Sequence, residues 1–442
     1  MTAIAVPSRA PNVLAVAAGA AFLALLDTTV ANLAVADVRT DFAGASVAGT
    51  TWLITIYAVT FAACLAPAGR VADVVGRRTL LLVGVGAFTL LSLLCALAPS
   101  LEALLLARGL QGAAAAAMIP ASLAVVLADT APERRAAAIG AWSAAGALAA
   151  AAGPALGGVL VDTVGWRSLF LINVPIGVAI LVGARNVGGG APGGRLPDAV
   201  GTILLGLAIG GAALGISQGP EWGWGDPATL GVLVGAVLSA AVALRRSFTQ
   251  PTPALETGLW RAPRFAAANL ASLLYGAALF PWMLIGVLFL ITIWDYSPLE
   301  AGLAMTPGAV VAAAVALAAA RRTTPRLAVS GGALILAIAG AICTLALPET
   351  PSFLGFWLPV GVLIGAGMGA ITTGVSTAAA LSVQPERFAA AVGLNQTARQ
   401  VGGALGVAAL AALVGTDIAS FQDVYLFCTL ATLGVAVLGR RL

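Results

Sequence analysis

The chain has 442 residues, of which 60% are hydrophobic and only 9% are charged, and its formal net charge is +4. A water-soluble chain carries about 25% charged residues, so this composition excludes a soluble globular protein and predicts that most of the surface lies in lipid. The absence of histidine removes the commonest metal ligand and the usual proton shuttle near neutral pH. The four cysteines lie apart in apolar stretches, so we expect no metal site, no disulfide and no cofactor.

Fourteen apolar stretches follow one another along the chain, and most reach the ~20 residues that a membrane-spanning helix needs. The first is too long for a signal peptide and is taken as a retained helix. The sixth and the last are short and are expected to borrow neutral flanking residues. The sequence therefore predicts an all-α membrane protein with 14 transmembrane helices, in stretches 10–36, 42–69, 79–101, 103–128, 136–161, 168–184, 199–220, 227–244, 265–294, 301–320, 327–348, 350–385, 388–416 and 424–439.

The basic residues are all arginines, and they fall unevenly between the two sides of the predicted membrane. With a cytoplasmic N-terminus, eighteen of the 22 lie in inner loops, two lie in outer loops and two lie within spans. Such an excess is typical of cytoplasmic loops. We therefore expect a multi-pass protein with both termini cytoplasmic, and the Arg-only, Ala- and Gly-rich composition favours a bacterial inner membrane.

Two Gly- and Pro-rich inner segments, 187–197 and 245–264, bracket the seventh and eighth stretches. Six stretches precede this pair and six follow it, and repeated halves are typical of secondary transporters. The expected architecture is an N-terminal six-helix bundle in 1–188, a linker with two inserted helices in 189–250, and a C-terminal six-helix bundle in 251–442. We found no convincing identity between the halves, so the expected repeat depends on number and spacing alone.

The first stretch contains Asp27, the only carboxylate well inside any stretch, with seventeen uncharged residues before it and nine after it. Ionised carboxylates are costly in lipid, and burial favours the protonated form. Asp27 is therefore the candidate for reversible protonation, and we expect Arg108 to hold it ionised when the two approach; whether their helices face each other is left open by the sequence. The alternative is a carboxylate in the outer third of the membrane that is capped by Thr28 or paired with an arginine.

The loop after the second stretch places Asp73 between Gly69 and the turn Gly76-Arg77-Arg78. The glycines suit a tight turn between antiparallel helices. The acid can pair with the arginines or with a neighbouring helix N-terminus. The alternative is a basic loop that only signals topology.

Arg108 lies five residues into the fourth stretch and is followed by Gln111. A buried arginine is costly in lipid unless it is paired or hydrated; the alternative is an arginine that extends to the outer interface. In the fifth stretch, Gly153 and Pro154 with Gly157 and Gly158 predict a kinked, closely packed helix.

Near the C-terminus, Asn395 and Arg399 are four residues apart and share a helix face. Arg399 could also be an anchor at the inner interface. Together with other polar and aromatic residues they are candidates for a substrate cavity, although lipid-facing or packing roles are the alternative for the aromatics. The cavity candidates are Asn32, Trp52, Tyr57, Gln111, Trp142, Asn395 and Arg399.

These motifs occur in order along nearly the whole chain, and together they resemble the major facilitator superfamily. The strings Leu26–Ala34 and Gly393–Gly403 are similar to those of its fourteen-span drug:proton antiporters. The sequence departs from that family at four positions, where it has Ala36, Val74, Ala149 and Ser168 in place of the usual Pro, Arg, Gly and Trp.

The resemblance implies alternating access between two bundles. It implies that Asp73 and its arginines latch the bundles, that Arg108 takes part in proton transfer, and that the motif from Gly153 to Gly158 belongs to an exporter. Departures at Val74 and Ala36 put the strength of the latch and a local bend of the first helix in question.

The expected function is proton-coupled export of small amphipathic drugs or a natural product. An alternative is a proton-coupled importer or metabolite exchanger of the same fold. A membrane enzyme or scaffold is disfavoured because the chain has neither His nor Lys. The partners would be a small molecule, protons and lipid, without nucleic acid, and we expect a monomer. The single deep acid favours a neutral or singly cationic substrate.

Overall fold

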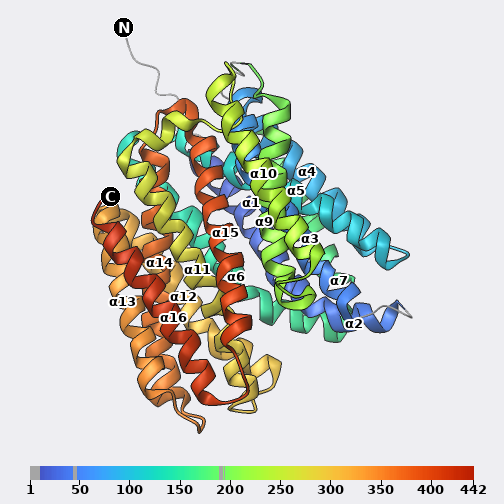
Figure 1. Ribbon diagram of the computed structural model, residues 1–442, viewed down its shortest axis with the longest axis vertical. Coiled ribbons are helices and arrows are strands. Elements are labelled where there is room, and N and C mark those ends of the chain that lie inside the picture. The colour runs from blue at the N-terminus through green and yellow to red at the C-terminus, as the bar shows by residue number, and fades with distance from the viewer. Residues whose placement is uncertain (1–9, 43–46, 189–192, 194) are drawn as a thin grey trace.

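The computed structural model describes residues 10–42, 47–188, 193 and 195–442, and these are almost entirely helical (Figure 1). The long helices run α1 (Ala10–Val30), α3 (Val47–Val75), α4 (Arg77–Ala96), α5 (Leu101–Asp129), α6 (Arg135–Val164), α9 (Ala199–Trp222), α10 (Pro227–Thr249), α11 (Pro263–Thr292), α12 (Pro298–Arg322), α13 (Pro325–Ala346), α14 (Leu358–Leu381), α15 (Phe388–Leu413) and α16 (Ile418–Gly439). Shorter helices are α2 (Ala34–Asp41), α7 (Ser168–Leu171) and α8 (Asn173–Gly183).

Local sequence explains where several of these helices begin. Ser100 accepts a hydrogen bond from the Ala103 N–H at the start of α5, and Asp198 accepts one from Gly201 at the start of α9. Ser297 and Glu300 form a reciprocal capping box at the start of α12, with proline in the first helical position. Such caps satisfy N–H groups that have no partner within the helix.

Twelve helices in the described residues are long and apolar enough to cross a membrane, and the segment Ser168–Gly183 is a shorter apolar one. That segment is broken at Ile172 into α7 and α8. The 26-residue α15 is not among the twelve, because its first half carries four strongly polar side chains. The all-helical fold is thus as predicted, whereas apolar length alone identifies fewer than fourteen spans. The polar residues of α15 are Asn395, Gln396, Arg399 and Gln400.

The helices form two groups, the first half (α1 to α8) and the second half (α11 to α16). Most of the first half lies on the right of Figure 1 and the second half on the left, with α6 reaching across to the second half. The packing order repeats between them. In the first half α5 packs on α3 and α4, and α1 packs on α6; in the second half α14 packs on α12 and α13, and α11 packs on α15.

This repeat exposes an internal similarity that the sequence analysis missed. Residues 132–140 read PERRAAAIG, and residues 385–393 read PERFAAAVG. Each segment forms one 3₁₀ turn and then opens a long helix, α6 in the first half and α15 in the second. The similarity is short, and only the equivalent positions in the fold make it recognisable.

Helices α9 and α10 pack on each other, and α9 also lies against α3 and α15. Gly210 of α9 permits a close approach to Ala63 of α3. An ion pair from Arg246 Nε to Asp198 Oδ2 (2.6 Å) ties the end of α10 to the start of α9, and the guanidinium holds the pKa of Asp198 below its usual value.

Two helix pairs make the largest contacts between the two halves. In the Asp73 seam, α3 packs on α15 around Gly69, Asp73, Ala389, Ala390 and Gly393. In the alanine seam, α6 packs on α12 around Gly140, Ala144, Ala313, Ala316 and Ala320. Both contacts lie near the helix ends that carry Arg77, Arg135 and Arg321, which we call the arginine-rich end.

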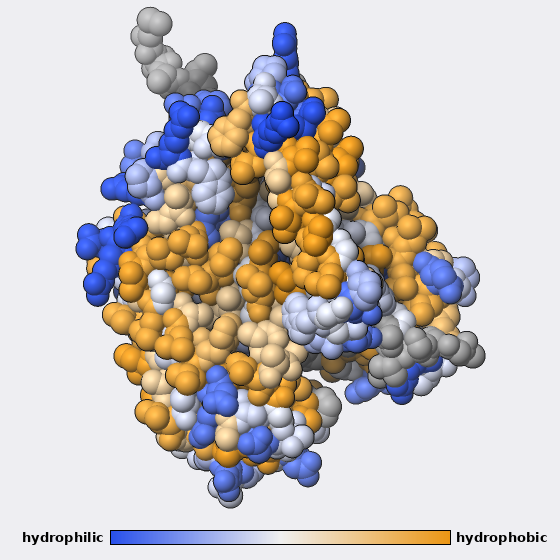
Figure 2. Space-filling view, in the orientation of Figure 1, coloured by the Kyte–Doolittle hydropathy of each residue, from blue (hydrophilic) through white to orange (hydrophobic). Residues whose placement is uncertain are grey.

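The outer surface is largely apolar. Figure 2 shows a broad band of hydrophobic side chains, with hydrophilic ones gathered toward its upper and lower ends. Helix α10, for example, exposes large apolar side chains over its length, including Val234, Val237, Leu238 and Phe248. A band of this kind suits the hydrocarbon of a bilayer.

Candidate functional site

Asp27 on α1 and Arg108 on α5 form an ion pair inside the first half. Arg108 Nη1 lies 2.6 Å from Asp27 Oδ2, and the two residues are 1% and 0% exposed. The sequence analysis proposed the two residues together as the proton-coupling element and left open whether they meet, and the structure brings them together. Removing one partner of such a buried pair costs about 3–5 kcal/mol, because the other charge is then uncompensated.

Two amides complete the coordination of the Asp27 carboxylate. Asn173 Nδ2 on α8 donates to Asp27 Oδ1 at 2.7 Å, and Gln111 Nε2 on α5 donates to the same oxygen at 3.2 Å. Both amides also donate to Ser92 Oγ on α4, at 3.3 and 2.8 Å. Four helices therefore contribute to one buried polar cluster, which we call the Asp27 cluster.

The guanidinium of Arg108 is held on its other sides as well. Its Nη1 also donates to Gln111 Oε1 at 2.8 Å, and its Nε donates to Leu53 O at 3.3 Å. The centre of the guanidinium lies 4.3 Å from the Tyr57 ring centroid and 5.5 Å from that of Phe170. Stacking on aromatic faces stabilises a cation without adding charge, so the cluster is closed and electrically neutral.

The Asp27 cluster contains two of the predicted residues besides Asp27 itself, Arg108 and Gln111, and two that the sequence analysis did not select. A further candidate, Tyr57 of α3, stacks on Arg108 from outside the cluster. Ser92 and Asn173 were missed, and the available signal was an uncharged polar residue inside an apolar stretch. Thr28 does not cap Asp27, because its hydroxyl donates to Ala24 O at 2.9 Å.

The other aromatic candidates lie elsewhere. Trp142 is 3% exposed in the core of the first half and donates to Ser122 Oγ at 3.1 Å. Trp52 lies against Trp222 of α9, with ring centroids 6.4 Å apart. The side chain of Asn32 lies outside the part of the chain that the structure describes.

Asp73 contacts the other half of the molecule at the start of α15. Its carboxylate accepts hydrogen bonds from the N–H groups of Ala390 at 2.8 Å and Ala389 at 3.3 Å, and it pairs with Arg77 at 2.8 Å. Helix N-termini attract negative charge through their free N–H groups and the helix dipole. The acid thus joins the end of α3 to the first turn of α15.

The neighbouring residues of the loop support this contact. Arg77 also donates to the Pro385 carbonyl, just before α15, and Arg78 donates to Arg185 O at 3.0 Å. Gly76 has a φ of 108°, which favours glycine. A Cβ on Gly69 would overlap the Ala389 carbonyl, so only glycine lets α3 and α15 approach this closely.

A further acid at the arginine-rich end was not selected from the sequence. Glu256, in the segment before α11, pairs with Arg70 of α3 at 2.8 Å and with Arg387 at 3.0 Å. One carboxylate therefore joins an arginine of each half. Its only sequence signal was an acid within a basic loop.

The glycines of the fifth stretch pack α6 against α1. A Cβ on Gly153 would overlap the Thr29 hydroxyl, and one on Gly157 would come within 2.6 Å of Leu33, whereas Gly158 faces open space. The side chain of Pro154 lies outside the described residues. Two of the four motif residues thus set the distance between α6 and the helix that carries Asp27.

Asn395 and Arg399 lie in the second half and contact different helices. Asn395 Nδ2 donates to Ser272 Oγ on α11 at 2.8 Å, and Arg399 Nη2 donates to Ser376 Oγ on α14 at 3.2 Å. Neither joins the Asp27 cluster.

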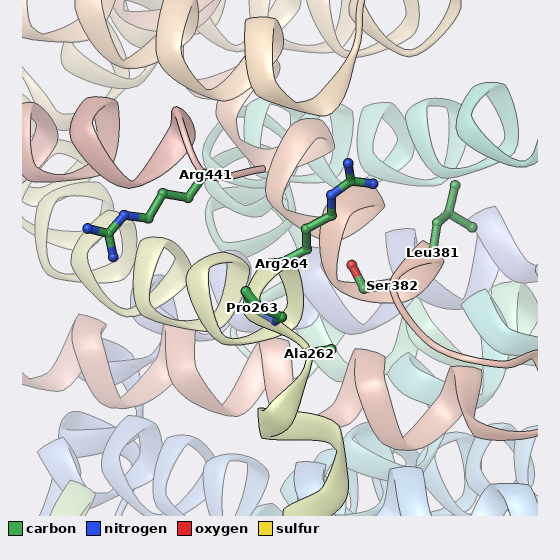
Figure 3. Close-up of a pocket in the computed structure, with 6 residues that line it drawn as sticks. All are labelled: Ala262, Pro263, Arg264, Leu381, Ser382 and Arg441. Carbon is green, nitrogen blue, oxygen red and sulfur yellow. The ribbon is translucent and has the colours of Figure 1, made fainter.

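A pocket of about 540 Å³ lies on the second half, and Figure 3 shows the residues that line it. Its lining includes Arg264 at the start of α11, Ser382 at the end of α14, and Arg441 at the C-terminus. None of the candidate substrate residues lines it. It therefore gives no support to a central substrate cavity.

A family model described as Major Facilitator Superfamily matches residues 17–407. The Cephamycin export protein CmcT of Amycolatopsis lactamdurans is 34% identical, over 98% of this chain and 92% of that protein. The Tetracenomycin C resistance and export protein of Streptomyces glaucescens is 32% identical, over 96% and 79%. The Puromycin resistance protein pur8 of Streptomyces alboniger is 37% identical, over 90% and 80%.

Among solved structures, the human organic anion transporter MFSD10 (TETRAN) matches with a TM-score of 0.67 at 16% identity, over 97% of this chain and 100% of that one. At this identity the likeness concerns the fold alone. Family match, relatives and fold agree with the resemblance noted from the motifs. The chain is a multi-pass membrane protein that belongs to the Major Facilitator Superfamily, a family of transporters and not of enzymes.

Proposed function

We propose that the chain is a proton-coupled exporter of small amphipathic drugs or a natural product, and that it works by alternating access. Support for export comes from the relatives, which are named as export or resistance proteins for cephamycin, tetracenomycin C and puromycin. Their names disfavour the alternative of a proton-coupled importer or metabolite exchanger.

The observation that carries proton coupling is the Asp27 cluster. Asp27 is the only carboxylate deep in an apolar stretch, and every oxygen contact it makes comes from Arg108, Gln111 or Asn173. A proton added to Asp27 removes its charge and leaves Arg108 uncompensated in a low-dielectric interior. We propose that a proton takes the place of Arg108 as the partner of Asp27 when α1 and α5 separate, and that it leaves when the ion pair forms again.

The Asp73 seam supplies the second element of the proposal. Proton uptake at Asp27 and release of substrate would belong to a state that is closed at the arginine-rich end, like the structure, but in which Asp27 and Arg108 have separated. Opening that end requires Asp73 to leave the N-terminus of α15 and the alanine seam to part. We propose Gly69, Asp73, Gly76, Arg77 and Arg78 as this conformational switch.

The proposed topology has fourteen spans, with α15 and the α7–α8 segment as the thirteenth and the sixth. Helix α15 can cross the membrane because two of its polar residues, Asn395 and Arg399, face α11 and α14 rather than lipid. Both termini and the arginine-rich end would be cytoplasmic, in a bacterial cell membrane. The proposed divisions remain 1–188, 189–250 and 251–442, in a monomer that exchanges protons for substrate.

The test begins with a susceptibility panel, in an efflux-deficient host, that includes cephamycin, tetracenomycin C and puromycin. A compound to which the chain gives resistance is then followed in proteoliposomes, where an imposed proton gradient is the only energy source. Wild-type protein should accumulate the compound, and Asp27→Asn should abolish accumulation. Asp41→Asn, which removes an exposed acid paired with Arg167, serves as the matched control and should transport normally.

Accumulation by the Asp27→Asn protein at the wild-type rate would leave Asp27 with a structural role only. Equal transport with and without the gradient in the wild type would refute proton coupling itself.

A further inference from the structure

Arg399 is a buried charge in the second half without an acidic partner. It lies eleven residues after Phe388, the first residue of α15, so it is ~16 Å along the helix axis, about midway through a ~30 Å hydrocarbon layer. Among the described residues, no ion pair includes it. The two deep arginines of the chain therefore differ, since Arg108 is neutralised by Asp27 and Arg399 is not.

No acid of the second half can reach the middle of the membrane to neutralise it. Every acid after residue 262 lies in a loop or in the first six residues of a helix. An uncompensated cation at this depth is strongly unfavourable. Those acids are Asp295, Glu300, Glu349, Glu386, Asp417 and Asp423.

Most of the hydrogen-bonding capacity of Arg399 is unused. A guanidinium has five N–H donors, and the structure shows one hydrogen bond, from Nη2 to Ser376 Oγ at 3.2 Å. The Nε is buried without a partner. The residue as a whole is 9% exposed, so part of it remains within reach of a ligand. Its guanidinium lies 5.7 Å from the Tyr275 ring centroid, which adds no charge.

Unpaired hydroxyls lie on the same part of α14 as the Ser376 that Arg399 contacts. Thr373 and Thr377 are three residues before and one residue after Ser376, and their hydroxyls are buried without a partner in the described structure. Buried polar groups normally have partners, so these hydroxyls and the unpaired guanidinium N–H groups have hydrogen-bonding capacity that a ligand could use.

We infer that Arg399, with Ser376, Thr373 and Thr377, is an anion site that binds the carboxylate of an amphipathic organic substrate. A guanidinium matches the two oxygens of a carboxylate with parallel N–H donors, and hydroxyls can donate to the remaining lone pairs. The Tyr275 ring offers an apolar face to the organic part. This reverses the expectation of a neutral or singly cationic substrate. Asp27 is neutralised by Arg108, whereas Arg399 has no acidic partner in the part of the chain that the structure describes.

The inference rests on the proposed transport function, but binding tests it directly. The probes are 2-naphthylacetate and its amide, 2-naphthylacetamide, which differ in charge and little in shape. Binding is measured by calorimetry on the full-length protein in detergent. Wild-type protein should bind the acid at least tenfold more tightly than the amide. Arg399→Gln should weaken acid binding tenfold or more and leave amide binding within twofold, and Arg399→Lys should restore part of it.

Two further measurements separate a binding role from a structural one. Arg321→Gln removes an exposed arginine at the end of α12 and should change neither affinity. Without ligand, Arg399→Gln should melt at or above the wild-type temperature, because it removes an uncompensated buried charge, and it should lose the stabilisation that the acid gives the wild type.

Equal wild-type affinity for acid and amide would overturn the inference, as would unchanged acid binding by Arg399→Gln. A melting temperature several degrees lower for the ligand-free variant would also overturn it, by making Arg399 a structural residue. Failure of the proposed function gives a different pattern, in which the acid binds through Arg399 but wild-type vesicles transport nothing under a proton gradient.

Discussion

Asp73→Asn should weaken the Asp73 seam by an amount that its contacts allow us to estimate. The carboxylate accepts hydrogen bonds from Ala389 and Ala390 at the N-terminus of α15. The amide oxygen of asparagine can keep one of these bonds but carries no charge. Loss of one charge-assisted hydrogen bond costs about 1.5–3 kcal/mol, so a change of ~2 kcal/mol should shift the ratio of closed to open seam by roughly 30-fold.

Double electron–electron resonance measures the distance between two spin labels and can detect this shift. We would label Val75→Cys at the end of α3 and Glu386→Cys before α15, both exposed, after replacing the partly exposed Cys64 by serine. The parent protein should show mainly the short distance, and Asp73→Asn should populate a longer one and lose transport. Asp129→Asn, an exposed acid at the end of α5, should leave the distribution unchanged.

An unchanged distance distribution in Asp73→Asn, together with normal transport, would refute the reasoning. The loop would then act as a topology signal, and the hydrogen bonds to α15 would not contribute to the balance between states.

Two other predictions follow from the packing and from the arginines. Gly153→Val should lower the melting temperature and the transport rate, because the new side chain would overlap Thr29 and overpacking costs about 1–3 kcal/mol. Gly158 faces open space, so Gly158→Val should leave both quantities unchanged. Equal effects of the two substitutions would contradict this reasoning. In intact cells, Arg322→Cys should resist an impermeant thiol reagent while Gly223→Cys reacts, and labelling at position 322 would overturn the proposed orientation.

The composition and apolar stretches were sufficient to predict an all-helical membrane protein, because each segment in lipid must satisfy its own backbone hydrogen bonds, as a helix does. The number of spans was harder to predict. Helix α15 buries Asn395 and Arg399 against its neighbours, and the sixth stretch is broken at Ile172. Neither the orientation of a helix face nor a break of this kind can be determined from hydrophobicity alone.

The candidate site shows a similar limit. Asp27 and Arg108 were found because a charge inside an apolar stretch is rare and costly. Their contact joins residues 81 positions apart and depends on the rotation of α1 and α5, which packing decides. Ser92 and Asn173 could not be selected, because uncharged polar residues are common in spans and only the three-dimensional structure shows that they surround Asp27.

The repeated PER segments and packing order make the chain resemble a fused homodimer. In a two-fold pair of six-helix units, the second helix of each would meet the fifth helix of the other, giving two identical interfaces. Here those interfaces are the Asp73 seam and the alanine seam, and they have diverged: one carries an acid at a helix N-terminus, and the other is lined by alanine and glycine. The inserted α9 packs on α3 and α15, so it braces only the charged interface. The two sides of the pair are therefore held differently, one by an acid and an added helix and the other by close packing of small residues.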